Sequence, residues 1–113
     1  MAYDTSKAGL HHLTKVLAAE LAPLRINVNS LSPGLVPTSA SDQMVAVTGK
    51  QFDEMAAQDI PLRRTGLPTD MAGAAIFLAS PASAWITGGI FAVDGGQVNA
   101  ITFGSPLQQQ AKL

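Results

Sequence analysis

The sequence predicts an α/β protein built around one parallel β–α–β unit. Leucine and alanine recur at three- and four-residue spacing from Thr5 to Ala22, which is the period of an amphipathic helix. The pattern then changes to short apolar or β-branched runs at 25–31 and 89–93. A helical pattern over 68–78 separates the two runs. A strand, a crossover helix and a second strand in this order form a parallel pair.

The composition is that of one domain that buries much of its surface. The chain has 113 residues, of which 47% are hydrophobic and 13% are charged. Its net charge of −1 favours neither nucleic acid nor an anionic membrane. The absence of Cys excludes disulfides and thiolate chemistry. No apolar run reaches the roughly 18 residues of a membrane span, and no signal peptide is visible, so we expect a cytoplasmic protein.

The first candidate site is Tyr3 with Lys7, four residues apart at the start of the 5–22 helix and therefore on one helix face. An ammonium group and a helix N-terminus both favour the phenolate form of a nearby tyrosine. Such a pair can pass a proton to or from a carbonyl or hydroxyl group. A Tyr and a Lys on an ordinary surface helix remain the alternative.

The two histidines of this helix do not predict a metal site. His11 and His12 are neighbours, and helical neighbours point about 100° apart. We expect both to lie on a solvated or subunit-facing surface.

The run at 25–31 should form a strand whose faces differ. Ile26 and Val28 point one way, while Asn27 and Asn29 point the other way and need hydrogen-bond partners. The Ser-Pro-Gly triplet at 32–34 ends this strand, followed by hydroxyl groups at 38 and 39. This loop is either a plain turn or part of a ligand crevice, because open α/β sheets bind ligands at the carboxyl ends of their strands.

The stretch after this loop predicts two short helices, at 41–47 and 51–58, which suit a substrate lid or a surface helical hairpin. The linker at 60–66 carries Arg63 and Arg64, which we expect to be solvated or salt-bridged. Pro68 should open the next helix, and Gly73 should admit a close neighbour.

The last part of the chain predicts a connector, a strand and a tail. Trp85, in the 82–88 connector, is expected to be a packing residue. After the 89–93 strand, Asp94-Gly95-Gly96 reads as a tight turn. Residues 98–113 are expected to form a flexible tail.

Together these motifs resemble the carboxyl-terminal half of a short-chain dehydrogenase/reductase. They are Tyr-Asp-Thr-Ser-Lys at 3–7, Arg-Ile-Asn-Val-Asn-Ser-Leu-Ser-Pro-Gly at 25–34 with Thr38, Pro-Leu-Arg-Arg-Thr-Gly-Leu-Pro at 61–68, Ala-Ile-Phe-Leu-Ala-Ser at 75–80, and the glycines from 88–89 to Asp-Gly-Gly at 94–96. The opening segment is most similar to 3-oxoacyl-carrier-protein reductases. The resemblance implies that 1–97 form the carboxyl half of a Rossmann-type doubly wound parallel sheet, incomplete at its amino-terminal side, with a substrate loop at about 39–60.

The same resemblance implies a role for each matching residue. Tyr3 would be the general acid/base, and Lys7 would lower its pKa and bind the nicotinamide ribose. Pro33, Gly34 and Thr38 would lie along the nicotinamide of NADP or NAD, with NADP favoured. The substrate would be a small carbonyl compound or secondary alcohol. The 5–22 helix and the 88–97 region would form a homo-oligomer interface.

Three motifs of that family are missing from the sequence: the Gly-rich phosphate turn, Asn-Ala-Gly, and the catalytic Ser before the Tyr. We therefore expect the 113 residues to be inactive alone, as a fragment, a truncated product or one piece of a larger one. Three functions stay open. They are the carboxyl half of an oxidoreductase, a non-catalytic remnant that associates with a full-length relative, and an unrelated helical binding module.

Overall fold

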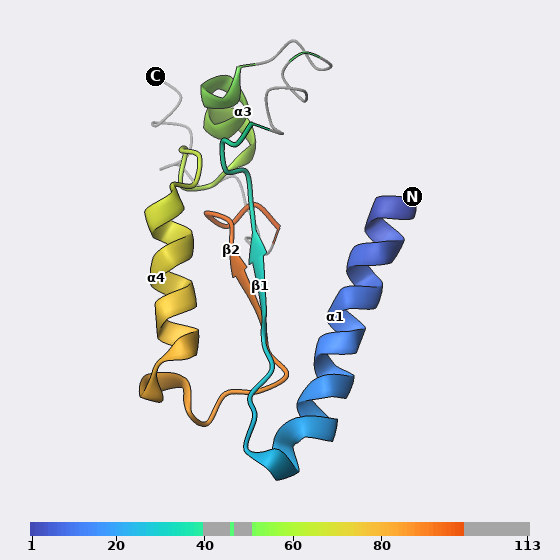
Figure 1. Cartoon of the computed structure of the whole chain (residues 1–113). Helices are drawn as coiled ribbons and strands as arrows, with labels where there is room; N and C mark the ends of the chain where they lie inside the picture. Colours follow the sequence, from blue (N-terminus) through green and yellow to red (C-terminus); the bar gives the residue numbers. More distant parts are fainter. Residues whose placement is uncertain (40–45, 47–50, 99–113) are drawn as a thin grey trace.

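A computed structural model describes residues 1–39, 46 and 51–98 of the chain. Its elements are α1 (Ala2–Leu21), β1 (Ser30–Pro33), α3 (Phe52–Asp59), α4 (Pro68–Ala79) and β2 (Ile90–Val93), with 3₁₀ turns at Ala22–Leu24 and Pro81–Ser83 (Figure 1). The strands pair in parallel, with Ser30 opposite Ile90 and Pro33 opposite Val93. The predicted α/β class and the β–α–β order are confirmed.

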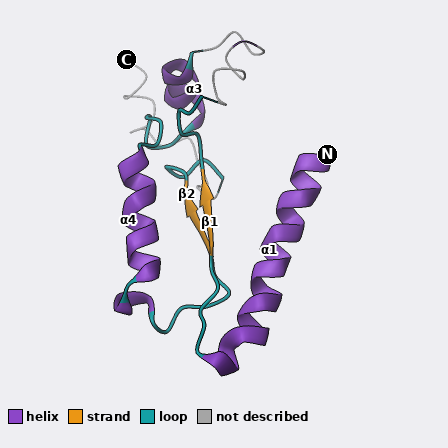
Figure 2. Cartoon of the chain, viewed as in Figure 1, coloured by secondary structure: helices purple, strands orange, loops and turns teal. Residues whose placement is uncertain are grey.

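The two strands lie between the two long helices. α4 packs on the strands, and α1 stands on their other side (Figure 2). α1 runs opposite to β1, so the start of α1 lies toward the carboxyl ends of the strands (Figure 1). α3 lies beyond those same ends. One end of the molecule therefore collects the helix start, both strand ends and the helix that follows the long loop.

α1 begins three residues earlier than the sequence pattern predicts. The Met1 carbonyl accepts hydrogen bonds from the backbone N–H of Thr5 (3.0 Å) and from its hydroxyl (2.9 Å), which extends the helix to Ala2. Thr14 and Ala18 are its buried residues. The helix ends at Leu21, one residue before the end of the predicted pattern at Ala22, and Arg25 then turns the chain with a φ of 59°.

The strand predicted at 25–31 is wrong in its bounds, because before Ser30 side-chain bonds, with one backbone bond from the Gly88 N–H to the Val28 carbonyl (2.7 Å), take the place of a regular ladder. The Asn27 amide donates to the Ala84 carbonyl (3.2 Å). The Asn29 amide donates to the Ile86 carbonyl (2.9 Å), and its carbonyl accepts from the Gly89 N–H (3.0 Å). Regular pairing starts only at Ser30. The prediction that both asparagines find partners is confirmed.

Most other elements lie close to their predicted bounds. The helix predicted at 51–58 is α3, and Pro68 is the first residue of α4. The expected neighbour of Gly73 is wrong, since a Cβ there would meet nothing within 4 Å. The helix predicted at 41–47 and the tail from 99 onward lie outside the described residues, apart from Ala46, which is helical.

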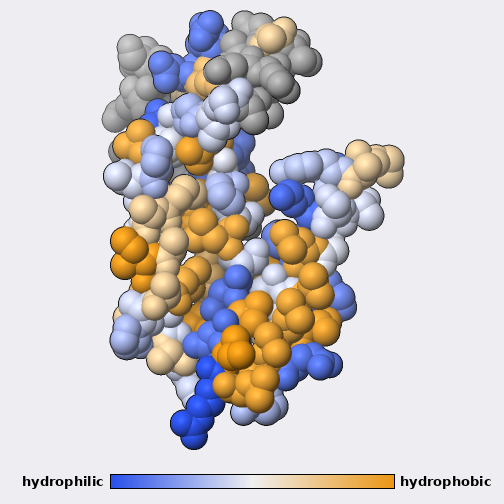
Figure 3. Space-filling view, in the orientation of Figure 1, coloured by the Kyte–Doolittle hydropathy of each residue, from blue (hydrophilic) through white to orange (hydrophobic). Residues whose placement is uncertain are grey.

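Few apolar side chains are buried among the described residues, where Ala18, Ala56 and Ile60 form the buried apolar set. Trp85 is 99% exposed, so its predicted packing role is wrong within this chain. Other exposed apolar residues are Leu10, Leu13, Val16 and Leu17 on α1 and Ile76 and Phe77 on α4. Figure 3 shows broad apolar areas open on one face of the molecule. None of the helices in the described part is long and apolar enough to cross a membrane.

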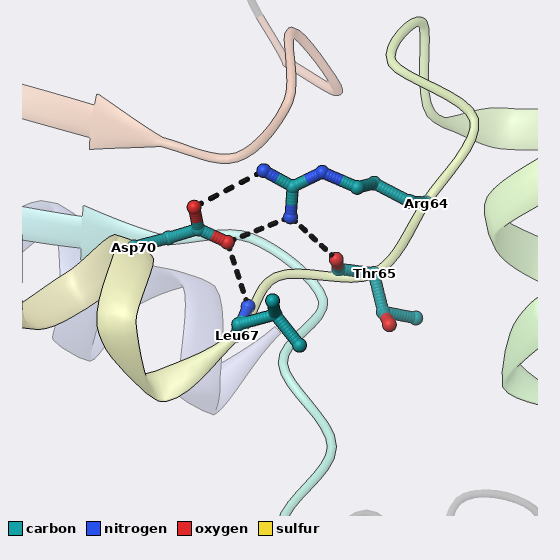
Figure 4. A network of polar contacts seen from close by, with 4 residues as sticks. All are labelled: Arg64, Thr65, Leu67 and Asp70. Carbon is teal, nitrogen blue, oxygen red and sulfur yellow. Dashed lines mark hydrogen bonds and ion pairs between the residues drawn. The ribbon is translucent and has the colours of Figure 1, made fainter.

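A polar network fixes the start of α4 (Figure 4). Arg64 and Asp70 form two parallel contacts, Nη1 to Oδ2 at 2.7 Å and Nη2 to Oδ1 at 3.1 Å. The same carboxylate accepts the N–H of Leu67 at 2.8 Å, which satisfies a free donor at the helix start. The hydrogen bonds from Arg64 and then Leu67 lower the pKa of Asp70 to about 2. The prediction of a salt bridge in the arginine pair is confirmed for Arg64.

We predict that the stabilisation from Asp70 disappears in acid. Its folded-state pKa lies below the unfolded value of about 3.9, so its contribution is complete above that value. The contribution is lost as the pH falls through about 4 to about 2. Urea unfolding should show Asp70→Asn less stable than wild type at pH 7 and equally stable near pH 2. Asp59→Asn, at the end of α3, is the charge-matched control. A difference in the free energy of unfolding between wild type and Asp70→Asn that stays the same at every pH would contradict the prediction.

Gly34 and Gly73 should respond oppositely to replacement by alanine. A Cβ at Gly34 would lie 2.6 Å from the Asp94 Cα, so backbone must move, and we expect a loss of about 1–3 kcal/mol in the free energy of unfolding. A Cβ at Gly73 meets open space inside α4, where alanine should add up to about 1 kcal/mol. Denaturant titrations of both variants test this pair. Equal effects on stability would show that the close approach at Gly34 is unimportant.

Candidate active site

The start of α1 brings Tyr3 and Lys7 together. Side chains on a helix lean toward its N-terminus, so Lys7 reaches back over the preceding turn. Its Nζ lies 5.3 Å from the centroid of the Tyr3 ring, within the range of a cation–π contact. Tyr3 is 71% exposed, so its hydroxyl is open to an incoming molecule. The pair offers a phenol and an ammonium group at one accessible point.

The residues after β1 lie at the same end of the molecule (Figure 1). The Gly34 N–H donates to the Val93 carbonyl at 3.0 Å, which continues the strand pairing by one residue. The sequence predicted a turn or a close approach at this glycine, and the structure shows a close approach to Asp94. Pro33 and Thr38 are exposed. Pro33 is the last residue of β1, and Gly34 and Thr38 lie on the loop that follows it, at the end where open α/β sheets bind ligands.

A cleft of about 360 Å³ separates α1 from the strands. Its lining comes from α1, β1, β2 and the segment after β2 and comprises His11, Ser32, Pro33, Ile90, Ala92, Asp94 and Val98. His11 is half-buried in this cleft, while His12 is exposed. The available signal was the spacing of four residues that joins Tyr3, Lys7 and His11 into one stripe.

A second cleft, of about 520 Å³, lies on the α4 side of the strand ends. Its lining includes Leu35, Leu62, Met71 and the Arg64–Asp70 pair. Asp94 and Ala92 line both clefts. The sequence identified Asp94 only as a turn residue, although Asp-Gly-Gly after an apolar strand was a visible signal of a specific loop structure.

The chemistry available at the predicted site is proton transfer and hydrogen bonding. The Tyr3 hydroxyl can donate or accept, and the Lys7 ammonium group donates. Within the described ranges, no group of three or more His, Asp or Glu side chains is placed to hold a metal ion.

Comparison with known proteins bears on this arrangement. Residues 1–98 match the family model described as enoyl-(acyl carrier protein) reductase. The chain is 38% identical over 99 residues to the 7alpha-hydroxysteroid dehydrogenase of Escherichia coli K12, covering 88% of this chain and 38% of that protein. It is 40% identical over 94 residues to the 3-oxoacyl-[acyl-carrier-protein] reductase FabG of Aquifex aeolicus, covering 83% and 36% of the two.

A solved structure shows the same correspondence. The Pseudomonas aeruginosa RhlG/NADP active-site complex superimposes with a TM-score of 0.73 at 41% identity, covering 84% of this chain and 38% of the other. The chain therefore spans well under half the length of the relatives that it matches. Since the family model matches nearly all of the described residues, the chain belongs to the short-chain dehydrogenase/reductase family.

Proposed function

We propose that this chain supplies the proton-transfer pair and the nicotinamide side of an oxidoreductase. The reaction is hydride transfer between NADP or NAD and a carbonyl compound or secondary alcohol. The observation that carries the proposal is the Tyr3–Lys7 pair, exposed at the start of α1 and at the same end of the molecule as the loop after β1. Family membership supports the reaction class.

In the direction of reduction, the Tyr3 hydroxyl donates its proton to the carbonyl oxygen of the substrate. In the direction of oxidation, the phenolate takes the proton from the alcohol. The Lys7 ammonium group lies 5.3 Å from the centroid of the Tyr3 ring and so places a positive charge next to the proton-transfer residue. When bound, the nicotinamide supplies or accepts the hydride.

The described residues fit one end of such a cofactor. Lys7 has N–H donors for ribose hydroxyls, and backbone groups of the loop after β1 can contact a carboxamide. α4 opens at Pro68 after Thr-Gly-Leu at 65–67, which is not a Gly-rich turn, so its start does not offer the usual pyrophosphate site. RhlG is described as a complex with NADP, which supports NADP over NAD for this chain.

Two further roles belong to the proposal: enclosing the substrate and contacting a second subunit. The segment at about 39–60 would enclose the substrate, because α3 brings its second half to the carboxyl ends of the strands. The 5–22 helix and the 88–97 region would pair with a second subunit. Four apolar side chains of α1, namely Leu10, Leu13, Val16 and Leu17, are 37–48% exposed and offer such a contact.

The same exposed surface favours a second candidate function. The chain could act without catalysis, by associating with a full-length member of the family through α1 and β2. Its small set of buried apolar residues is the observation behind this alternative.

Replacing Tyr3 tests the first proposal in a chimera. Residues 1–98 would replace the matching segment of the E. coli 7alpha-hydroxysteroid dehydrogenase, which supplies the rest of the fold. Tyr3→Phe should lower kcat at least about 100-fold, since the general acid is lost, and leave the Kd for NADPH or NADH within about twofold. Steady-state kinetics and fluorescence titration measure the two quantities. A Tyr3→Phe chimera that keeps its kcat would refute the role.

Two lysine replacements in the same chimera distinguish a specific role of Lys7 from a general effect of removing a positive charge. Lys7→Ala should both lower kcat and weaken cofactor binding, because the ammonium group serves the phenol and the ribose. Lys15→Ala removes an exposed lysine two turns further along α1 and should change neither quantity. Equal losses in the two variants would indicate a general effect of charge.

Native mass spectrometry tests the second candidate. The 113-residue chain, mixed with a full-length relative such as the A. aeolicus reductase, should form a mixed oligomer if α1 associates. Leu13→Glu and Leu17→Glu place charges on the exposed stripe and should abolish the mixed species. A chain that stays monomeric alone and in the mixture would argue against this function.

A further inference from the structure

We propose that Asp94 is a positioning residue whose turn, 94–96, joins two loops of the site. One loop is the segment after β1, at Gly34. The other is the segment at 60–62, which ends the predicted substrate loop. We call the contact of this turn with both loops the joint, and we argue it from distances within this chain. Only its expected effect on cofactor binding rests on the proposed function.

On the first side, Asp94 lies directly against Gly34. A Cβ built at Gly34 would be 2.6 Å from both the Cα and the Cβ of Asp94, and 3.2 Å from its carbonyl oxygen. The adjacent bond from the Gly34 N–H to the Val93 carbonyl, 3.0 Å long, holds the two backbones at this distance. Any shift of the turn therefore displaces Gly34 as well.

On the second side, the turn contacts the segment that follows α3. The Leu62 N–H donates to the Gly95 carbonyl at 3.2 Å. A Cβ at Gly95 would lie 2.7 Å from Cγ2 of Ile60, which is only 2% exposed. The φ of Gly95 is 63°, a conformation that glycine adopts without strain. The turn is thus packed against the buried Ile60 and hydrogen-bonded to Leu62.

The Asp94 carboxylate holds the turn in this shape. Its Oδ1 accepts the Gly96 N–H at 2.9 Å, and its Oδ2 accepts the Val98 N–H at 3.0 Å. Hydrogen bonds to an ionised acceptor are stronger than neutral ones. Asp94 is half-buried and lines the clefts on both sides of the strands, so the turn is placed to influence both.

The two loops also touch at a second point, which provides an internal comparison. The Gly66 N–H donates to the Leu35 carbonyl at 2.9 Å, without help from the turn. If Asp94 positions the loops, replacing it should increase the amide exchange rates of Gly34 and Leu62 together. The Gly66 amide, held by a separate bond, should change less.

Amide hydrogen exchange on the full 113-residue chain tests the joint. In Asp94→Asn, at most one of the two carboxylate bonds can be kept, and in Asp94→Ala neither can. We expect exchange at Gly34 and Leu62, as well as Gly96 and Val98, to accelerate at least about fivefold. Amides of α4, such as that of Leu78 in its last turn, should keep their wild-type rates. Asp59→Asn carries the same charge change at an exposed site and should alter none of these amides.

Two outcomes would overturn the inference. If only Gly96 and Val98 accelerate, the carboxylate merely closes its own turn. If all amides accelerate equally, including that of Leu78, Asp94 acts through global stability.

A cofactor measurement in the chimera described above separates this inference from the proposed function. Asp94→Asn should raise the KM for NADPH or NADH more than it lowers kcat, because it shifts a binding loop and no reacting group. A wild-type chimera without cofactor binding would refute the proposed function, while the exchange experiment would still decide the joint.

Discussion

The parallel pairing of β1 with β2 determines where the other parts of this molecule lie. Sixty residues separate Ser30 from its partner Ile90, so the pairing closes a long loop and brings α3 and α4 to the strands. It also brings both strand ends to one edge, where Gly34 and Asp94 meet at a distance that leaves no room for a Cβ. The close approach explains why a glycine follows the proline of β1, and why the turn after β2 is in contact with two loops.

The Tyr3–Lys7 pair depends on a different and purely local constraint. Helix geometry alone puts residues four apart on one face, so the pair forms wherever α1 forms. Its location relative to the strand ends depends on the direction of α1, which runs opposite to β1 (Figure 1). Local helix geometry therefore puts Tyr3 beside Lys7, and the packing of α1 beside the strands determines what surrounds them, including the cleft that contains His11.

The exposed apolar side chains of this chain indicate contacts beyond those described above. Trp85 and the apolar stripe of α1 are exposed, while few apolar residues are buried in the described part of the chain. Apolar surface of this extent usually marks contact with another polypeptide segment or subunit. The relatives extend well beyond the matched region, which covers 36–38% of their length, and this is consistent with such contacts.

The sequence by itself determined what local rules control. Periodicity located α1, α3 and α4, Pro68 marked the start of a helix, and the ordered motifs identified the family. Tyr3, Lys7 and the loop after β1 were predictable for the same reason. The tertiary structure alone decided the late start of β1, the half-buried position of His11 and the approach of Asp94 to Gly34. The first and the last of these depend on residues about sixty positions apart in the chain, whose pairing no local pattern encodes: Asn27 and Asn29 bind backbone groups of 84–89, and Gly34 meets Asp94 only once both strands are aligned.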